Sequence, residues 1–330
     1  MHMRRPKPSL PEPQRLEEDV WALASPIPDS GPPFTLTYVL RGEDGAVRIV
    51  DPGWGGDENV AHLRGGLRRI GVELEDVAEV IATHHHPDHL GIADAIRTIS
   101  GARVLLSAEE REVLRHQLRP DRRDPGRYAE RLAGWGVPAA ERPALIAVMA
   151  APSDLVEVEP DGLVGDGDVL DWSGHRLRVL ATPGHTDGHI CLVDAERGAI
   201  YTGDHVLPRI TSGLGLGTRG ERDPLSDVLD SLEALSPFDA YRVLPGHEHP
   251  FSGLASRRHS IARHHLARTE EVVGLRAALG DAPVWEYAVR IRWSAGWDAL
   301  TGFFRHSALE QTERHLRLVA AGKADEMLGR

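Results

Sequence analysis

Alternating and periodic hydrophobic positions predict an α/β protein over most of the chain. Two β-rich runs, FTLTYVLR and AVRIVD, flank Gly42-Glu43-Asp44-Gly45, a turn sequence typical of a β-hairpin. Apolar residues at helical spacing follow over residues 59–70, and the run VAEVIATH then indicates a buried strand that ends in a histidine cluster. Strand and helix patterns continue to alternate through residues 91–118, so a layered α/β sandwich is the expected architecture.

Three segments and one insertion are expected from the composition along the chain. Residues 1–19 are proline-rich and are expected to form a flexible arm. Residues 20–254 carry the α/β pattern, interrupted at 119–153 by a proline-flanked helical insertion, for which both a surface excursion and a lid over a pocket remain open. Residues 255–330 have a helical pattern and predict a small C-terminal helical domain.

Composition narrows the classes of function. The 330 residues, 41% of them hydrophobic and 27% charged, are enough for a globular protein of about two domains. A formal net charge of -12 disfavours non-specific binding of nucleic acid. Cys191 is the single cysteine, which excludes an intramolecular disulfide and a cysteine-based metal site. Without a secretory leader pattern or a membrane-spanning apolar run, we expect a cytoplasmic protein with no membrane partner.

The most informative segment is THHHPDH at residues 83–89, which places four histidines and one carboxylate directly after a predicted strand. Imidazole and carboxylate groups are ligands that zinc prefers. In an extended turn, His84 and His86 can face one metal while Asp88 and His89 face another. A histidine-rich run alone is weak evidence, because the chain has 18 histidines. The interpretation therefore depends on partners elsewhere in the chain.

Three further candidate ligands lie in separate glycine-containing motifs: His185 in TPGHTDGH, Asp204 in YTGDH and His247 in LPGHEHP. Glycine allows the backbone to approach a crowded centre. The order H-x-H-x-D-H, then His, Asp and His, over about residues 34–252, resembles the metallo-β-lactamase superfamily. That resemblance implies an αββα sandwich, a hydrolase activity and a metal centre. Histidines that merely fill a core would not account for these motifs in this order.

The resemblance also implies which metal each candidate residue binds and which residues take part in catalysis. Two zinc ions per chain are expected, with iron or manganese as alternative metals. Their implied ligands are His84, His86 and His185 for the first metal, Asp88, His89 and His247 for the second, and Asp204 as a bridge between them. Asp88 and Asp204 are the candidate catalytic residues, because two metals would activate a bridging water that Asp88 can orient towards the substrate.

Other residues near these motifs are expected to support the ligands or to shape the pocket: Asp51, His205, Arg209 and His249. Asp51, in IVDPG, matches a recurrent family position that orients a ligand histidine. His85 lies between two ligands and is not expected to bind metal itself. His189 is expected to lie either beside the ligands or on the surface.

The candidate bridging carboxylate of Asp204 limits the resemblance to certain branches of the superfamily. True β-lactamases lack an aspartate at the position of Asp204, so the sequence is closer to the glyoxalase-II-like and RNase-Z-like members. Only 43 positions separate Asp204 from His247, which leaves no room for the large domain of the RNA-processing β-CASP members. His86 stands where flavodiiron proteins have a glutamate, which disfavours that branch as well.

The C-terminal segment resembles a winged-helix-type tail found on one branch of hydrolases. Its wing is cut short at Arg330, so docking of nucleic acid is doubtful, and a homodimer contact or pocket closure is an equal alternative. One predicted helix carries a basic stretch, Arg257, Arg258, Arg263 and Arg268. This stretch is either a solvated face or a site for a phosphate or a CoA nucleotide.

The leading hypothesis is a dinuclear zinc hydrolase of a small-molecule thioester or ester, such as an acyl-CoA or a glyoxalase-II-like substrate. A phosphodiesterase or endoribonuclease of the same fold is the first alternative. A mononuclear iron sulfur dioxygenase, which would need only His84, His185 and Asp204, is the second. A non-catalytic regulator is disfavoured because every candidate ligand is present.

Overall fold

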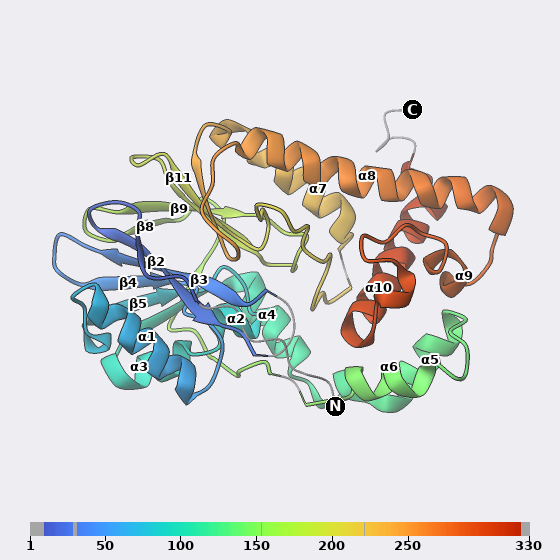
Figure 1. Cartoon of the computed structure of the whole chain (residues 1–330), viewed down its shortest axis with the longest axis horizontal. Helices are drawn as coiled ribbons and strands as arrows, with labels where there is room; N and C mark the ends of the chain where they lie inside the picture. The colour runs from blue at the N-terminus through green and yellow to red at the C-terminus, as the bar shows by residue number, and fades with distance from the viewer. Residues whose placement is uncertain (1–9, 29–31, 153, 221, 325–330) are drawn as a thin grey trace.

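The computed structural model describes residues 10–28, 32–152, 154–220 and 222–324. Two β-sheets pack face to face in its centre, and helices cover the outer face of each sheet (Figure 1). This arrangement confirms the predicted αββα sandwich. A group of helices from the middle and the end of the chain gathers beside the sandwich and gives the molecule its elongated outline (Figure 1).

The first sheet follows chain order. In the described part of the chain its strands are β1 (Gln14–Arg15), β2 (Val20–Pro26), β3 (Phe34–Arg41), β4 (Val47–Val50), β5 (Val77–Ile81), β6 (Arg103–Ser107) and β7 (Gly162–Val164). Arg41 pairs with Val47 across the predicted hairpin turn. Helices α1 (Asp57–Arg69) and α3 (Ala93–Ser100) cover the outer face, where Leu63, Leu67 and Ile96 are buried against the sheet.

The second sheet is formed by the later part of the chain. Its strands lie in the order β12 (Arg242–Pro245), β11 (Ala199–Gly203), β10 (Ile190–Asp194), β9 (Arg176–Ala181) and β8 (Val169–Asp171). Helices α7 (Pro224–Ala234) and α8 (Leu254–Leu279) cover its outer face. Val228 of α7 and Ile261 of α8 pack with Cys191 of β10 in one buried cluster, which makes this the fourth layer of the sandwich.

The two sheets contact each other through a buried core that includes Tyr38 of β3 and Tyr201 of β11. Their rings meet edge to face with centroids 5.1 Å apart. The Tyr38 hydroxyl also donates a hydrogen bond to the Pro245 carbonyl at 2.7 Å. Because Pro245 ends β12, this bond ties the end of a strand in the second sheet to a strand of the first.

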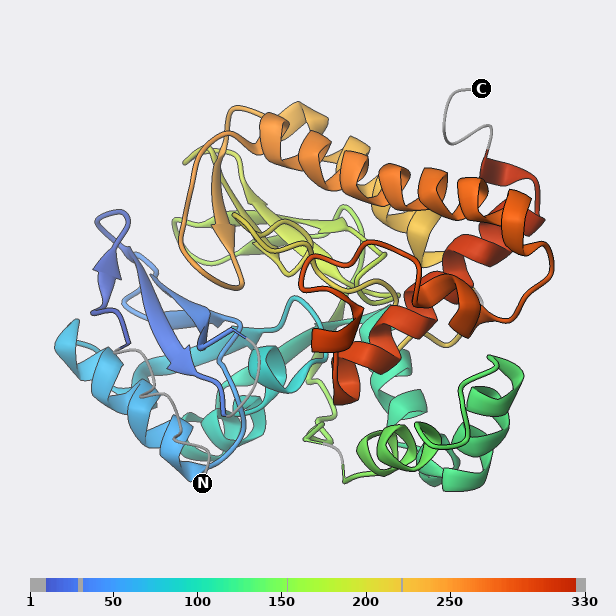
Figure 2. The same ribbon diagram turned by 45° about the vertical axis from the view of Figure 1, so that its right-hand side comes forward.

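The insertion and the C-terminal helices form one helical unit beside the sandwich (Figure 2). The insertion holds α5 (Pro125–Gly134) and α6 (Arg142–Met149), and it follows α4 (Ala108–Gln117). The C-terminal part holds α9 (Val284–Ala288) and α10 (Gly302–Ala320). Leu132 and Leu145 of the insertion share a buried cluster with Ala288 and Leu309. The insertion therefore packs against the C-terminal helices.

Two sequence-based boundaries need adjustment. Gln14–Arg15 of the proline-rich arm pairs with β2, so this part of the arm is a strand, while residues 1–9 lie outside the described residues. Helix α8 begins at the expected start of the C-terminal domain, yet its first turns pack in the outer layer of the sandwich. The described residues 252–324 contain no strand.

No helix in the part of the chain that the structure describes combines the length and apolar character that a bilayer span requires.

Truncating Leu145 should loosen the contact between the insertion and α10. Leu145 is 2% exposed, so we expect Leu145→Ala to lower the free energy of unfolding by about 2–5 kcal/mol and to speed proteolysis within residues 119–153. Val148→Ala, on the same helix but 41% exposed, should change stability by less than about 0.5 kcal/mol. Equal cleavage of both variants in limited proteolysis would contradict the packing described here.

Candidate metal centre

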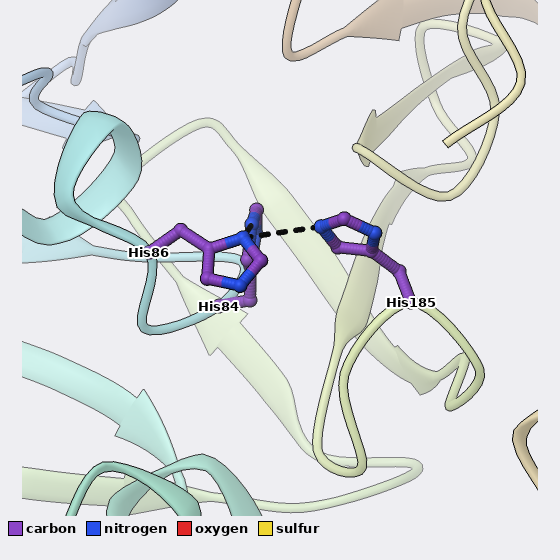
Figure 3. Close-up of side chains that lie close together, drawn as sticks. All are labelled: His84, His86 and His185. Carbon is purple, nitrogen blue, oxygen red and sulfur yellow. Dashed lines mark hydrogen bonds between the residues drawn. The ribbon is translucent and has the colours of Figure 1, made fainter. Parts of the chain in front are cut away.

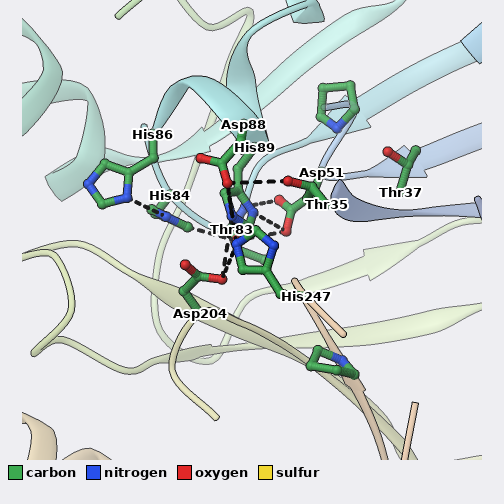
Figure 4. A network of polar contacts seen from close by, with 12 residues as sticks. Thr35, Thr37, Asp51, Thr83, His84, His86, Asp88, His89, Asp204 and His247 are labelled. Atoms are coloured by element: carbon green, nitrogen blue, oxygen red, sulfur yellow. Dashed lines mark hydrogen bonds and ion pairs between the residues drawn. The ribbon is translucent and has the colours of Figure 1, made fainter. Parts of the chain in front are cut away.

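All of the predicted ligands meet at one edge of the sandwich, where four segments from both sheets converge (Figures 3 and 4). The segment after β5, which includes the short helix α2 (Pro87–Leu90), brings four of them. The other segments are the β9–β10 connection, the residue after β11 and the loop after β12. In chain order the seven residues are His84, His86, Asp88, His89, His185, Asp204 and His247.

His84, His86 and His185 form what we call the first group (Figure 3). The Nε2 atom of His84 lies 2.9 Å from Nδ1 of His86, and Nε2 of His185 lies 3.1 Å from the same atom. Burial lowers the pKa of all three imidazoles, and for His84 and His86 the neighbouring histidines lower it further. The three rings are therefore neutral at pH 7, which is the form that binds metal.

Asp88, His89 and His247 form what we call the second group. Nε2 of His247 lies 3.3 Å from Oδ2 of Asp88, and Nε2 of His89 lies 3.5 Å from it. Burial lowers the pKa of His247, but the carboxylates of Asp204 and Asp88 outweigh it and raise the pKa to about 10. This group therefore holds a proton at neutral pH that a bound cation would replace.

Asp204 lies between the two groups, with one carboxylate oxygen facing each. Its Oδ1 is 3.2 Å from Nε2 of His247 and 3.5 Å from Nε2 of His89. Its Oδ2 is 3.7 Å from Nε2 of His185. Burial raises the pKa of Asp204, but the neighbouring imidazoles of His247 and His89 lower it well below the usual range. An ionised carboxylate between two groups of ligands has the geometry of a bridge.

The ligand rings are oriented by hydrogen bonds made on their outer side. Nδ1 of His185 donates to the Gly213 carbonyl at 2.8 Å, and Nδ1 of His247 donates to the Phe34 carbonyl at 2.9 Å. These bonds hold Nδ1 on the outer side and direct each Nε2 atom inward, where it can bind a metal once it carries no proton. Nε2 of His89 and Oδ1 of Asp204 are among the buried side-chain atoms of the described residues that make no hydrogen bond of regular geometry. Converging nitrogen and carboxylate donors of this kind fit a divalent metal.

Asp51 contacts a candidate ligand histidine, His89, as the sequence-based hypothesis expects. Its carboxylate accepts hydrogen bonds from Nδ1 of His89 at 2.9 Å, from the Thr83 N–H at 2.7 Å and from the Thr83 hydroxyl at 2.9 Å. The Thr83 oxygen in turn accepts from Nδ1 of His84 at 3.1 Å. Asp51 has a φ of 55°, an unusual left-handed backbone for a residue with a side chain. One carboxylate thus orients a histidine of each group.

The other predicted supporting residues lie in different surroundings. His205 is buried beside Asp204 and lines a small cavity with His185 and His265. His249 is exposed. Arg209 is exposed as well, and its backbone N–H donates to Glu248 while its carbonyl accepts from Arg257.

His189 supports the position of Asp204. Its Nε2 atom accepts a hydrogen bond from the Asp204 N–H at 3.2 Å, so the ring proton is on Nδ1, which donates to the Thr182 hydroxyl at 2.9 Å. Burial and the neighbouring histidines lower the pKa of His189 well below its usual value, in agreement with this neutral tautomer. The sequence placed His189 near the motif without assigning it this contact.

Two functional contacts were missed by the sequence analysis. The Thr35 hydroxyl donates to Oδ2 of Asp88 at 3.2 Å. The sequence around Thr35 indicated a strand and gave no signal for this contact. Glu110 is fully buried and contacts two ligand-bearing loops. The available signal for Glu110 was its spacing from Ser107, which matches a helix capping box.

Three of the four arginines in the predicted basic stretch, Arg257, Arg258 and Arg268, are engaged within the protein. Arg258 pairs with Asp239 at 2.8 Å and with Glu233 at 2.9 Å. Arg268 stacks on Trp293 at 4.2 Å. Arg257 donates to backbone carbonyls in residues 207–210. These guanidinium groups hold the fold together, and the interpretation as a phosphate site is therefore not supported.

Comparison with known proteins points to one family. The sequence model of the Metallo-beta-lactamase superfamily matches residues 30–247, which include every candidate ligand. A probable metallo-hydrolase of Bacillus subtilis is 27% identical over 290 residues, covering 82% of this chain and 84% of that protein. A hydroxyacylglutathione hydrolase of Ectopseudomonas mendocina is 28% identical over 250 residues, covering 74% of this chain and 75% of that protein.

Solved structures agree with the sequence relatives. A metallo-beta-lactamase family protein from Thermus thermophilus superposes with a TM-score of 0.73 and 29% identity, covering 93% of this chain and 95% of that one. The match therefore extends beyond the sandwich into the helical unit. A beta-lactamase domain protein from Burkholderia ambifaria, at 24% identity and a TM-score of 0.72, shares the fold.

Metal binding should release protons at pH 7.5. The pKa of His247 is raised to about 10, so its imidazole is protonated at this pH and must lose that proton to become a ligand. We expect isothermal titration of the metal-free protein with Zn²⁺, in buffers of different ionisation enthalpy, to show release of about one proton or more. A heat that does not depend on the buffer would contradict the protonation state assigned to the second group.

Proposed function

Because the chain belongs to the metallo-β-lactamase superfamily and is a hydrolase, we propose that it uses a dinuclear zinc centre to hydrolyse a small thioester or ester. The observation that carries the proposal is the position of Asp204. One of its carboxylate oxygens faces the second group at 3.2 Å, and the other faces the first group at 3.7 Å. A single-metal site would not need both oxygens to be directed in this way.

The composition of the two groups supports zinc in both positions. The first group offers three imidazoles, and the second offers two imidazoles and a carboxylate, with Asp204 shared between them. Nitrogen-rich sets of this kind suit zinc, while iron and manganese remain chemically compatible alternatives. The completeness of the second group favours the dinuclear hydrolase over a mononuclear iron dioxygenase, which would have no use for Asp88, His89 and His247.

When bound, two zinc ions would lower the pKa of a coordinated water and polarise the substrate carbonyl. The residues of this chain supply the orientation. The Thr35 hydroxyl donates to Oδ2 of Asp88 at 3.2 Å and fixes that carboxylate, whose side chain is 15% exposed. Asp88 is therefore accessible to an attacking water and can accept a hydrogen bond from it. A thiolate leaving group is stable near neutral pH, so a thioester makes little demand for a separate general acid.

The choice of a thioester over a phosphodiester rests on the relatives and on charge. Relatives named hydroxyacylglutathione hydrolase support an acyl-glutathione or acyl-CoA type of substrate. A net charge of -12 opposes the approach of a polyanion. Three arginines of α8, Arg257, Arg258 and Arg268, are already engaged within the protein. These observations disfavour RNA as the substrate.

The proposal predicts thiol release from acyl-CoA or acyl-glutathione by the zinc-loaded protein, followed with a thiol reagent. The rate should depend only modestly on salt, because a small substrate releases few counterions. RNA and a phosphodiester model substrate serve as comparisons. Phosphodiester turnover that falls steeply with salt, together with no thioester hydrolysis, would reverse the assignment.

Replacing the bridging carboxylate should remove one metal. We expect elemental analysis to find about two zinc ions per chain in the unaltered protein and about one in Asp204→Asn, because an amide does not bridge two cations. Turnover should fall by more than about 100-fold, beyond the loss typical of residues outside the metal ligands. Asp230→Asn, an exposed aspartate on α7, is the matched control and should change neither value. One iron and no zinc in the unaltered protein would overturn the dinuclear hydrolase.

A further inference from the structure

Glu110 occupies an ordinary position in the sequence and an unusual one in the structure. It is the third residue of α4, and Ser107, the N-cap, accepts its backbone N–H at 3.0 Å. In a standard capping box the glutamate side chain returns to the N-cap backbone at the protein surface. Here the side chain is 0% exposed and reaches away from the cap, into the space between two ligand-bearing loops.

The Glu110 carboxylate joins those loops with one oxygen each. Its Oε2 accepts the His85 backbone N–H at 3.2 Å and also contacts Nδ1 of the His85 ring. Its Oε1 accepts the Gly188 N–H at 3.1 Å and the Thr186 hydroxyl. His85 stands between His84 and His86, and Thr186 follows His185. The two loops that Glu110 connects are therefore the two that carry the first group.

The negative charge of Glu110 distinguishes this connection from an ordinary helix cap. Burial raises the pKa of Glu110, but His85 and the hydrogen bond from Thr186 outweigh this effect. The pKa of Glu110 is therefore below its usual value. The carboxylate is therefore ionised, and it acts purely as an acceptor for four donors. A buried charge is costly unless it is fully hydrogen-bonded, and capping a helix would not require one.

Two glycines allow the backbone to pack closely against Glu110 and His85. A Cβ atom on Gly188 would lie 2.4 Å from the Glu110 backbone nitrogen, so only glycine permits the approach of the His185 loop to α4. A Cβ on Gly217 would lie 2.8 Å from Nε2 of His85. Gln117, at the end of α4, donates to the Gly217 carbonyl at 2.6 Å. The same segment provides the Gly213 carbonyl that orients His185.

The second group is held from a different direction. His247 donates to the Phe34 carbonyl, Asp88 accepts from Thr35, and His89 donates to Asp51. These partners lie at the ends of β3 and β4 in the first sheet. The β3–β4 edge thus holds the second group and, through Asp51 and Thr83, also His84 of the first, whereas α4 reaches the loops of the first group.

We propose that Glu110 is a positioning residue for the first metal, because it fixes the spacing between the His84–His86 segment and the His185 loop. The inference rests on the metal centre of the proposed function and does not depend on the substrate. Glu110→Gln preserves the shape of the side chain but turns one acceptor into a donor, which then faces a donor of one loop. The first group should therefore open while the second group keeps its geometry.

The test measures zinc affinity in two backgrounds, each of which leaves one metal site. His247→Ala removes a ligand of the second group, and His86→Ala removes a ligand of the first. Glu110→Gln should weaken zinc binding about 10–100-fold in the His247→Ala background, the range typical of residues that orient metal ligands. In the His86→Ala background we expect a change of less than about threefold. Competition with a chromophoric chelator measures both values.

Two further measurements separate positioning from general stability. Thr186→Val removes one of the four donors without loss of volume and should give a smaller effect with the same preference for the first site. Asp161→Asn, a carboxylate that accepts the Val104 N–H and contacts Arg97, should leave both affinities unchanged. The visible spectrum of Co²⁺ in the His247→Ala background should also shift when Glu110 is replaced, because the ligand angles change.

Equal weakening in both backgrounds, or no weakening in either, would overturn the proposal and leave Glu110 as a residue of the fold alone. If Glu110→Gln does not fold, the site preference of Thr186→Val decides the question in the same way. Failure of the proposed function gives a different result. In that case the unaltered protein would bind fewer than two metals, or it would bind two and hydrolyse no thioester, while the affinities above would still be measurable.

Discussion

The structure depends on metal-binding atoms that converge in a buried space. His89, His185 and His247 each donate one ring N–H outward, to Asp51 or to a backbone carbonyl, and this directs the other ring nitrogen, Nε2, towards the centre. Ionisable groups crowded together in this way are costly when they are removed from water. A cation converts the same arrangement into a favourable one. The rest of the fold must therefore hold the rings close together against their mutual repulsion.

The seam between the two sheets provides this restraint. Four of the ligands follow β5 of the first sheet, while Asp204 and His247 follow β11 and β12 of the second. The Tyr38 hydroxyl binds the Pro245 carbonyl two residues before His247, across the interface of the sheets. Packing of the aromatic core thus sets the distance between ligands that belong to different sheets, and stability of the core becomes a condition for the geometry of the centre.

Local sequence patterns predicted the features that depend on residues close together in the chain. THHHPDH, TPGHTDGH, YTGDH and LPGHEHP predicted ligands that the structure brings together, and the alternation of strands and helices predicted the sandwich. The contacts that were missed depend on partners distant in sequence. Glu110 has the pattern of a surface cap, and Arg258 and Arg268 have the pattern of a basic face, until Thr186, Asp239 and Trp293 are placed beside them. The union of the insertion with α10 likewise arises from apolar residues far apart in the chain.

The division of support between the two groups has a structural consequence for the helical unit. Helix α4 connects the centre to the insertion, because its first turn carries Glu110 and its last turn carries Gln117. Arg314 of α10 donates to the Gly215 carbonyl at 2.9 Å, in the segment that also orients His185 through Gly213. These contacts reach the first group, whereas the second is held by the β3–β4 edge, which contacts the first group only through Asp51, Thr83 and His84. Displacement of the helices would therefore act on the histidine-only side of the centre, and the side that contains Asp88 would stay anchored to the sandwich.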